Sequence, residues 1–313
     1  MSVRPKLNLL FLGLLLAYVA LACLPGEPAL ATFTLAFAGD VMLGRGVARA
    51  LAGNWETAFA QVRPWLAEAD LAFANLESPL TIQPQIASGY DLRAAPQAIT
   101  ALHVAGFDIM SLANNHSLDA GEAGRAQTRA TLSAGGIVGV VERETGHLVS
   151  RQAPYPALVY QLLAFDDSTV PLDLEVASRM VAAAKEEADL VIVSAHWGGE
   201  YQAAPSPRQQ SIAQALARAG ADLIVGHGPH VLQPVERVGQ TLVAYSLGNF
   251  LFDQPYPVDC RWGLVLRITR LAQSKRLTVE LLPTVVERGR VRLASPQEAP
   301  AILAHLFRGR RTD

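Results

Sequence analysis

Side chains able to bind metal or to transfer protons recur along the chain, each after a short apolar run. They are Asp40, Asn75, Glu77, Asn115, His116, His196, His227, His230 and Asn249. In α/β folds the carboxyl ends of the strands meet at one edge of a sheet, where these folds place their ligands. We therefore expect these side chains to converge on one site, with Asn75 and Asn249 lining the pocket beside it.

The chemistry of this set is that of a metal centre. Carboxylate and amide oxygens mixed with imidazole nitrogens suit Mn, Fe, Zn or Mg, whereas a structural zinc site is normally built from thiolates. A carboxylate that bridges two ions would help to activate a water and to stabilise the leaving oxygen in phosphoryl or acyl transfer. Asp40 or Glu77 could bridge in this way. The pattern predicts one or two divalent ions and a hydrolytic reaction.

Other residues near these motifs have more than one interpretation. Arg45 lies between two glycines, which would let a positive charge and backbone amides approach an anion, so it is a candidate catalytic residue. Trp197, Glu200 and Tyr201 either line the pocket or pack in the core. Asp119 is expected to cap a helix that begins at residue 120 rather than to bind metal.

The elements that would position these side chains alternate between strands and helices. Seven short apolar runs predict strands, at residues 33–38, 71–74, 109–113, 158–165, 190–195, 223–225 and 242–246. Five amphipathic segments predict helices, at residues 58–69, 95–105, 120–134, 174–188 and 208–219. Two alternating segments, 262–270 and 277–286, flank a short polar turn and predict an antiparallel hairpin. The chain is therefore expected to form an α/β domain with a mixed sheet.

Composition is that of a folded globular protein. Of the 313 residues, 50% are hydrophobic and 17% are charged, which is enough to bury a large core. The formal net charge is -2, which argues against nucleic acid as a partner because phosphate binding needs a clustered basic face. After residue 31 the chain has one cysteine, Cys260, so no internal disulfide is expected.

The first 31 residues predict export from the cytoplasm. Arg4 and Lys6 precede an apolar run at residues 7–24. This run is long enough to be retained as a membrane anchor, yet the chain also fits cleavage before Thr32 and carries Cys23 in a sequence that resembles a lipid-attachment site. We expect a signal peptide or signal anchor at 1–31, one domain at 32–293 and a tail at 294–313, with the body of the protein in the cell envelope, anchored or secreted.

Six short motifs contain most of the candidate site residues. In chain order they are Gly39-Asp40-Val41-Met42-Leu43-Gly44-Arg45, Asn75-Leu76-Glu77-Ser78-Pro79, Ala113-Asn114-Asn115-His116, Ala195-His196-Trp197-Gly198, His227-Gly228-Pro229-His230 and Tyr245-Ser246-Leu247-Gly248-Asn249-Phe250. Together they resemble the CapA family of poly-γ-glutamate capsule synthesis proteins, which is similar to calcineurin-like metallophosphoesterases. The resemblance implies a four-layer fold, in which two packed mixed β-sheets are flanked by helices.

The resemblance also implies roles for single residues. The positions expected to bind metal are Asp40, Glu77, Asn115, His196 and the pair His227 and His230. His116 corresponds to the acid beside the leaving group. Two departures weaken a second metal position: Met42 stands where the metallophosphoesterase pattern has a histidine, and the last two histidines are separated by two residues instead of one.

Three functions remain open at this level. The first is a membrane-tethered, metal-dependent hydrolase that acts on a phosphoester or a glutamyl amide in poly-γ-glutamate synthesis or export, with membrane synthase subunits as partners. The second is a non-catalytic assembly or polymer-binding subunit built on a hydrolase fold, which Met42 favours. The third is a secreted phosphatase acting on a small-molecule substrate.

Overall fold

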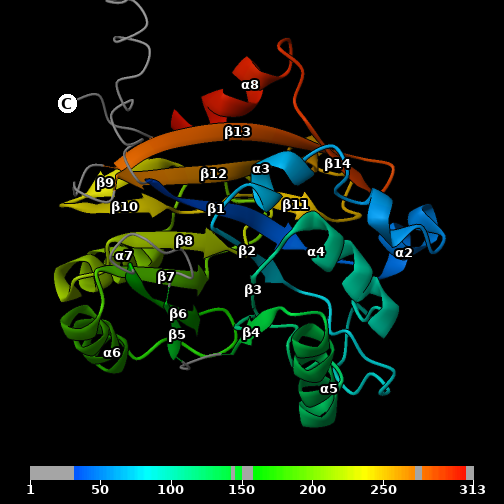
Figure 1. Cartoon of the computed structure of the whole chain (residues 1–313), viewed down its shortest axis with the longest axis horizontal. Helices are drawn as coiled ribbons and strands as arrows, with labels where there is room; N and C mark the ends of the chain where they lie inside the picture. Colours follow the sequence, from blue (N-terminus) through cyan, green and yellow to red (C-terminus); the bar gives the residue numbers. More distant parts are fainter. Residues whose placement is uncertain (1–31, 142–144, 150–157, 272–276, 308–313) are drawn as a thin grey trace, which may run out of the picture.

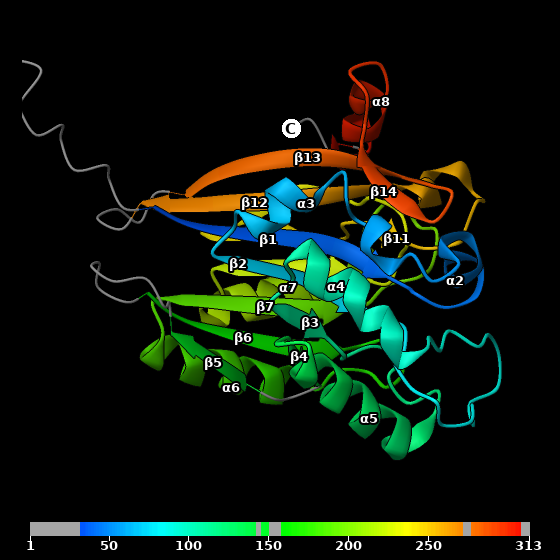
Figure 2. The same ribbon diagram turned by 45° about the vertical axis from the view of Figure 1, so that its right-hand side comes forward.

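Two β-sheets pack face to face, and helices cover the outer face of each sheet (Figures 1 and 2). The computed structural model describes residues 32–141, 145–149, 158–271 and 277–307. This arrangement confirms the predicted fold class, two packed mixed sheets flanked by helices.

The first sheet has eight strands, in the order β14-β13-β12-β1-β2-β3-β4, with β11 paired to the end of β1. Strands β1 to β4 are parallel, and β12 to β14 form an antiparallel meander on the other side of β1. The strands are β1 (Thr32–Val41), β2 (Leu71–Leu76), β3 (Ile109–Ser111), β4 (Val138–Val140), β11 (Asn249–Leu251), β12 (Trp262–Leu271), β13 (Leu277–Glu287) and β14 (Arg290–Leu293). Strands β12 and β13 are the predicted hairpin.

The second sheet has six strands, in the order β5-β6-β7-β8-β10-β9. Its centre is parallel, and β5 and β9 pair antiparallel at the two edges. The strands are β5 (Thr145–Val149), β6 (Val159–Asp166), β7 (Leu190–His196), β8 (Leu223–His227), β9 (Val235–Val238) and β10 (Thr241–Ala244).

The helices lie outside the two sheets. Four helices pack against the first sheet and two against the second, and α8 lies beside β13 (Figure 1). They are α2 (Arg45–Leu51), α3 (Arg63–Ala67), α4 (Ile99–Ala105), α5 (Gly121–Ala134), α6 (Leu174–Glu187), α7 (Pro207–Ala219) and α8 (Ala299–Ala304), with short 3-10 turns η1 (Trp55–Thr57), η2 (Pro96–Ala98), η3 (Val258–Arg261) and η4 (His305–Phe307).

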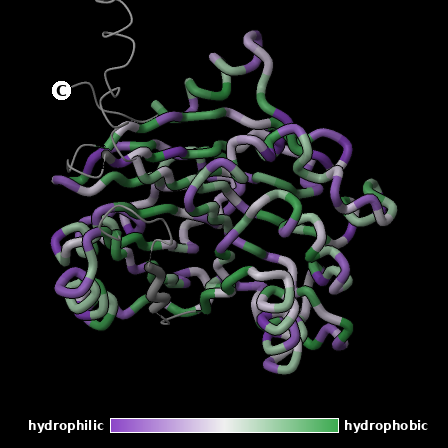
Figure 3. The backbone as a smooth tube through the Cα atoms, viewed as in Figure 1, coloured by the Kyte–Doolittle hydropathy of each residue, from purple (hydrophilic) through white to green (hydrophobic). Residues whose placement is uncertain are grey.

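Side-chain alternation along the central strands explains the layering. In β1, Leu35 and Phe37 face the second sheet, whereas Ala36 and Ala38 face the helices. Large side chains therefore fill the middle core, and small ones let the helices approach the sheet closely. Figure 3 shows the same order in hydropathy, because the central strands are mostly hydrophobic while hydrophilic segments gather on the outer helices and loops.

The observed elements differ from the predicted ones mainly in their ends and in short strands. The helix predicted at 58–69 is only α3 (Arg63–Ala67), since Pro64 lacks an N–H and favours the first turn of a helix. The strands β4, β5, β9, β11 and β14 were not predicted, because each has five residues or fewer and shows no clear period of two, whereas the equally short β3 and β10 coincide with continuous apolar runs.

Two predictions about the ends of the chain remain predictions. The export segment at 1–31 lies outside the described residues, and within the described ranges no helix is long and apolar enough to span a bilayer. Beyond the predicted domain boundary at 293, Ile302 and Leu306 are buried in the same hydrophobic cluster as Leu264 and Leu266 of β12.

Candidate metal centre

Strand register places the polar residues in two short rows that face each other across the sheets. In the first sheet, Asp40 lies between Asn249 and Asn75. In the second sheet, His196 lies between Asp166 and His227. All six residues are buried, and contacts between Asp40 and His227 join the two rows. The predicted convergence of strand ends is therefore present.

A glycine makes the first row possible. A Cβ atom at Gly39 would lie 2.0 Å from the carbonyl oxygen of Gly248, so no larger residue fits where β1 meets the segment before β11. The Asp40 amide donates to this same oxygen at 2.9 Å. The close approach sets Asn249 beside Asp40.

Amide groups orient the two carboxylates. Asn75 Nδ2 donates to Asp40 Oδ1 at 2.9 Å and to Glu77 Oε1 at 3.1 Å. Asn114 Nδ2 in turn donates to Asn75 Oδ1 at 2.9 Å, and the Gly228 amide donates to Asp40 Oδ2 at 3.2 Å. Both carboxylates are thus held as acceptors that face the histidines.

Three imidazoles close around these carboxylates. His227 Nδ1 lies 3.2 Å from Asp40 Oδ1, and His230 Nδ1 lies 3.3 Å from Asp40 Oδ2. His196 Nε2 is 3.3 Å from Glu77 Oε1, and His230 Nε2 is 3.9 Å from Glu77 Oε2. The centre therefore combines two carboxylates with three imidazoles in a buried space.

The charges of this cluster compensate one another. Burial alone would raise the pKa of Asp40, but the facing imidazoles of His227 and His230 hold it well below its usual range. Burial would lower the pKa of His196, yet hydrogen bonds to Asp166 and Glu77 raise it to about 10. The pKa of His230 rises to about 9 because the charge of Glu77 and the contact with Asp40 outweigh burial. Protons on His196 and His230 thus balance the carboxylates in the absence of another cation.

The donor set fits a divalent metal ion. Ligand atoms of Asp40, Glu77 and His230 lie within 4.8 Å of one another. Within the described residues, Glu77 Oε2 and both ring nitrogens of His227 are buried and make no well-aligned hydrogen bond, although His227 Nδ1 keeps its 3.2 Å contact with Asp40 Oδ1. An unsatisfied buried polar atom costs about 1–3 kcal/mol, so three of them at one point are expected where a cation is to be bound. Mixed oxygen and nitrogen donors suit Mn, Fe or Zn.

A cavity of about 130 Å³ opens beside this cluster. It is lined by Arg45, Tyr90, Leu92, His116, Glu200, Tyr201, His230, Phe252 and Gln254. Three of these residues have a left-handed backbone although none is glycine: Arg45 (φ 47°), Tyr201 (φ 63°) and His230 (φ 60°). Such backbone costs roughly 1–2 kcal/mol per residue and gathers at functional sites. The strain therefore marks this cavity as the place where a ligand meets the cluster.

Neighbouring side chains fix the wall of the cavity. Arg45 pairs with Asp253 (Nη2 to Oδ1, 2.9 Å) and lies 5.2 Å from the centre of the Tyr90 ring. Gln254 Nε2 donates to the Tyr201 hydroxyl at 3.2 Å, and burial together with Glu200 raises the pKa of Tyr201. The wall thus offers a held guanidinium and a neutral hydroxyl.

His116 also lines the cavity, and a carboxylate holds it. His116 Nδ1 is 2.9 Å from Asp119 Oδ2. The prediction that Asp119 caps the next helix is wrong, because α5 begins after Ala120 without a side-chain cap. Asp119 is instead the partner of His116.

Two predicted site residues lie elsewhere. Asn115 is exposed, and its neighbour Asn114 enters the cluster instead. Trp197 does not line the cavity. It is buried in the core between the second sheet and helices α6 and α7 (the outer core), where its indole donates to the carbonyl oxygen of Tyr245 at 2.8 Å. Met42 lies in the core under the helices, and its sulfur accepts from the Gly44 amide at 3.1 Å.

Two further residues that were not predicted lie behind His196. Asp166 Oδ1 lies 3.3 Å from His196 Nδ1, and Ser168 Oγ lies 3.0 Å from the same nitrogen. Asp166 directly follows the strand predicted at 158–165, so it carries the same signal as the other strand-end residues.

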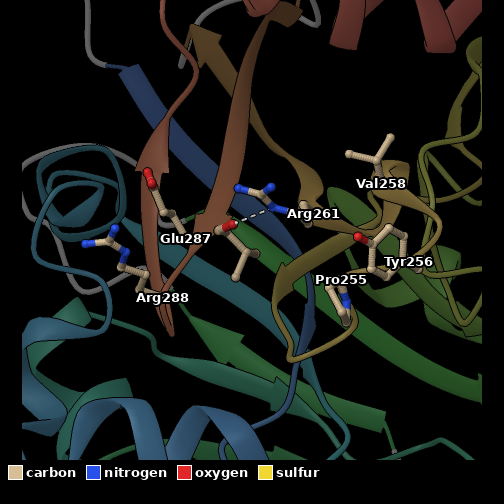
Figure 4. Close-up of a pocket in the computed structure, with 7 residues that line it drawn as sticks. Pro255, Tyr256, Val258, Arg261, Glu287 and Arg288 are labelled. Atoms are coloured by element: carbon tan, nitrogen blue, oxygen red, sulfur yellow. Dashed lines mark hydrogen bonds between the residues drawn. The ribbon is translucent and has the colours of Figure 1, made fainter.

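A larger hollow lies apart from the cluster (Figure 4). It has a volume of about 370 Å³ and lies between the segment that contains Pro255 and Tyr256 and the end of β13. Arg261 lies in its wall, where Nε donates to the carbonyl oxygen of Val286 at 3.3 Å. Gln254 lines the cavity at the cluster and Pro255 lines this hollow, so one loop separates the two spaces.

Comparison with known proteins places the chain in a family. The sequence model of the family described as "Bacterial capsule synthesis protein PGA_cap" matches residues 34–254. "PGA biosynthesis protein CapA" of Bacillus subtilis is 33% identical over 239 residues, which cover 70% of this chain and 63% of that protein. "Capsule biosynthesis protein CapA" of Bacillus anthracis is 34% identical over 247 residues, which cover 71% and 60%. The similarity thus spans less than two thirds of either Bacillus protein.

A more distant relative and a solved structure are also similar to this chain. A "Probable polyglutamine synthesis accessory protein" of Mycobacterium tuberculosis is 28% identical over 262 residues, covering 72% of this chain and 68% of that protein. The crystal structure of a hypothetical protein from Thermus thermophilus has a TM-score of 0.50 at 16% identity and covers 80% of this chain and 99% of that one, which supports the fold. From the family match and the two Bacillus relatives it follows that the chain belongs to the PGA_cap family of bacterial capsule synthesis proteins.

Proposed function

We propose that this protein is a metal-dependent hydrolase that acts in the synthesis or export of poly-γ-glutamate or a related acidic polymer of the bacterial cell envelope. The observation that carries the proposal is the buried cluster with unsatisfied atoms on Glu77 and His227, next to a strained cavity. The names of the relatives support the choice of polymer, because they refer to PGA, capsule and polyglutamine synthesis.

The metal ligands would come from both sheets. Asp40, Glu77 and His230 would hold one ion, and His196 and His227 extend the set toward a second. A divalent ion bound here would supply a Lewis acid and a water of lowered pKa.

Residues of the cavity wall would handle charge and protons. Asp119 holds His116 Nδ1, which leaves Nε2 to give a proton to a leaving group in the cavity. Asp253 holds Arg45, so the guanidinium is fixed where it can orient a negatively charged group of the substrate. Phe252 and Leu92 line the same cavity and reduce its contact with water.

The proposed location is the outer face of the cytoplasmic membrane. The basic and apolar pattern of residues 1–31 supports export, followed by retention as an anchor, lipid attachment at Cys23 or cleavage before Thr32. Membrane-bound polymer synthase subunits are the proposed partners, in keeping with the name of the mycobacterial relative.

The test is hydrolysis by the purified full-length chain supplied with Mn²⁺ or Zn²⁺. Oligomers of γ-linked glutamate and a phosphomonoester such as p-nitrophenyl phosphate are offered in parallel. Turnover of either substrate should fall to background in Glu77→Gln, while Asp167→Asn, which alters an acid paired with Arg208 outside the cluster, should retain it. Equal turnover in both variants would reject the hydrolase.

Met42 favours a second candidate function. In place of a possible imidazole ligand, this side chain packs in the helix-side core. A protein with an incomplete metal site could serve as a non-catalytic assembly or polymer-binding subunit. Cells that carry Glu77→Gln at normal protein levels would then still make polymer, whereas the hydrolase predicts loss of polymer.

A further inference from the structure

The hydrogen bonds around Ser168 determine which nitrogen of His196 carries a proton. Ser168 Oγ donates to Asp166 Oδ1 and also lies 3.0 Å from His196 Nδ1. A hydroxyl has one proton, so toward His196 the serine oxygen can only accept. The other neighbour of Nδ1 is the Asp166 carboxylate, at 3.3 Å, which also accepts. Both contacts require the proton to be on Nδ1.

Asp166 is itself held in place. Oδ2 accepts from the Thr169 hydroxyl at 2.7 Å, and Oδ1 accepts from the Ser168 amide at 2.9 Å. The residue is 7% exposed, and strand register sets it directly beside His196 in the pair β6 and β7. Its carboxylate can therefore act as a fixed acceptor.

The opposite edge of the imidazole faces the cluster. His196 Nε2 is 3.3 Å from Glu77 Oε1. With Nδ1 committed to Asp166 and Ser168, only Nε2 can offer a lone pair to a metal ion held beside the carboxylates. In metal sites an acceptor behind the ligating histidine commonly fixes its tautomer and ring orientation.

We propose that Asp166 and Ser168 are a positioning pair that fixes His196 as an Nε2 metal ligand. The inference rests on the proposed metal centre and adds two residues to it that touch neither metal nor substrate. Both residues of the pair lie where β6 ends and the next loop begins. The neighbouring acid, Asp167, does not contact the His196 ring: its side chain accepts from the Leu172 amide at 2.7 Å and pairs with Arg208. Asp167 is therefore a matched control.

The experiment titrates the metal-free full-length chain with Co²⁺ and follows visible absorption, which reports both affinity and coordination. Asp166→Ala should weaken Co²⁺ binding by about 10–100-fold, the usual effect of removing such a partner, and should change the absorption bands. Ser168→Ala should have a smaller effect in the same direction. Ser168→Thr, which keeps the hydroxyl at an exposed position, should restore binding, and Asp167→Asn should leave it unchanged.

A second readout identifies the ligating nitrogen. With Zn²⁺ bound, the imidazole ¹⁵N chemical shifts of His196 should show a proton on Nδ1 and metal on Nε2. Thermal unfolding of each metal-free variant checks that the variant is folded. If Asp166→Ala does not fold, Ser168→Ala provides the test.

The outcomes separate this inference from the function on which it rests. Unchanged Co²⁺ affinity in folded Asp166→Ala or Ser168→Ala, or Zn²⁺ on Nδ1, would overturn the positioning pair while the metal centre stands. Weakened binding in the variants without turnover of any substrate would support the pair and count against the hydrolase. No metal binding by the unaltered chain would overturn both.

Discussion

The two rows of the centre differ in how their side chains are held. In the first sheet, Asp40 is surrounded by donors, since Asn75 and the Gly228 amide both bind its oxygens. In the second sheet, His196 has a carboxylate behind it, whereas His227 makes no well-aligned hydrogen bond among the described residues and has only the 3.2 Å contact of its Nδ1 with Asp40 Oδ1. The first row is thus complete without a metal, and the second is not.

This difference indicates that the two rows have different roles. The amide-bound carboxylates supply fixed negative charge, and the imidazoles supply nitrogens whose partner is a proton or a metal. A site that served only stability would not leave His227 unsatisfied in a buried position. Variants of the two rows should therefore differ in what they lose.

The largest effect is expected from Asp40→Asn in the first row. The change removes the charge that faces both His227 and His230 while keeping the shape of the side chain. Metal content should fall to background because Glu77 would be the one carboxylate left in the cluster against the two charges of a divalent ion, the imidazoles being neutral when they bind metal. Elemental analysis of the purified variant measures this, with Asp167→Asn as the control. Full metal content in Asp40→Asn would show that the first row is not the anionic half of the site.

His116→Ala should affect turnover and spare the metal. His116 lines the cavity but belongs to neither row, so its loss should reduce kcat by about 10²–10⁴-fold, the range for a general acid, at unchanged metal content. Steady-state kinetics on the best substrate checks the prediction, and Asp119→Asn should give a smaller loss through the same histidine. A parallel loss of metal would instead assign His116 to the cluster.

Asn249→Ala compares the residue that contacts His230 Nδ1 with Asp166, which contacts His196 Nδ1. Asn249 Oδ1 lies 3.0 Å from His230 Nδ1, as Asp166 does for His196, but it is a neutral amide. We expect a loss of Co²⁺ affinity of about tenfold or less, at the low end for such partners. Its Nδ2 also donates to Gln254 and to the Cys260 carbonyl, so unfolding should become about 1–3 kcal/mol easier. An affinity loss larger than that of Asp166→Ala would contradict the ranking.

Trp197→Phe should have the smallest effect on the centre. The indole lies in the outer core, stacked on Tyr245 at 5.9 Å, so the variant loses one hydrogen bond and some packing. Denaturant unfolding should show a loss of about 1–2 kcal/mol, with metal affinity and KM unchanged. A changed KM would show that Trp197 acts on the substrate cavity and not only on the core.

Much of this arrangement could be predicted from strand-end residues alone. Asp40, Glu77, His196, His227 and His230 follow short apolar runs, and parallel strands bring such ends together whatever the details of packing. The layered fold followed from the alternation of strands and helices and from the resemblance of the motifs.

The errors came from side-chain direction. Consecutive residues of a strand face opposite sides, so His196 in the cluster implies that Trp197 lies in the core between the second sheet and its helices, and not in the cavity wall. Asn114 and Asn115 follow a strand of only three residues, and the turn that decides which of them points inward has no periodic signal. Met42 follows a register irregularity after Asp40, which sends its side chain to the helix-side core.

The most direct test of the central claim is the number of metal ions per chain in the unaltered protein, measured by elemental analysis after exposure to Mn²⁺, Fe²⁺ or Zn²⁺ and removal of the excess. The account predicts one or two ions per chain, lost in Asp40→Asn and retained in Asp167→Asn. A chain that stays free of metal under these conditions would contradict the assignment of the two rows as a metal centre.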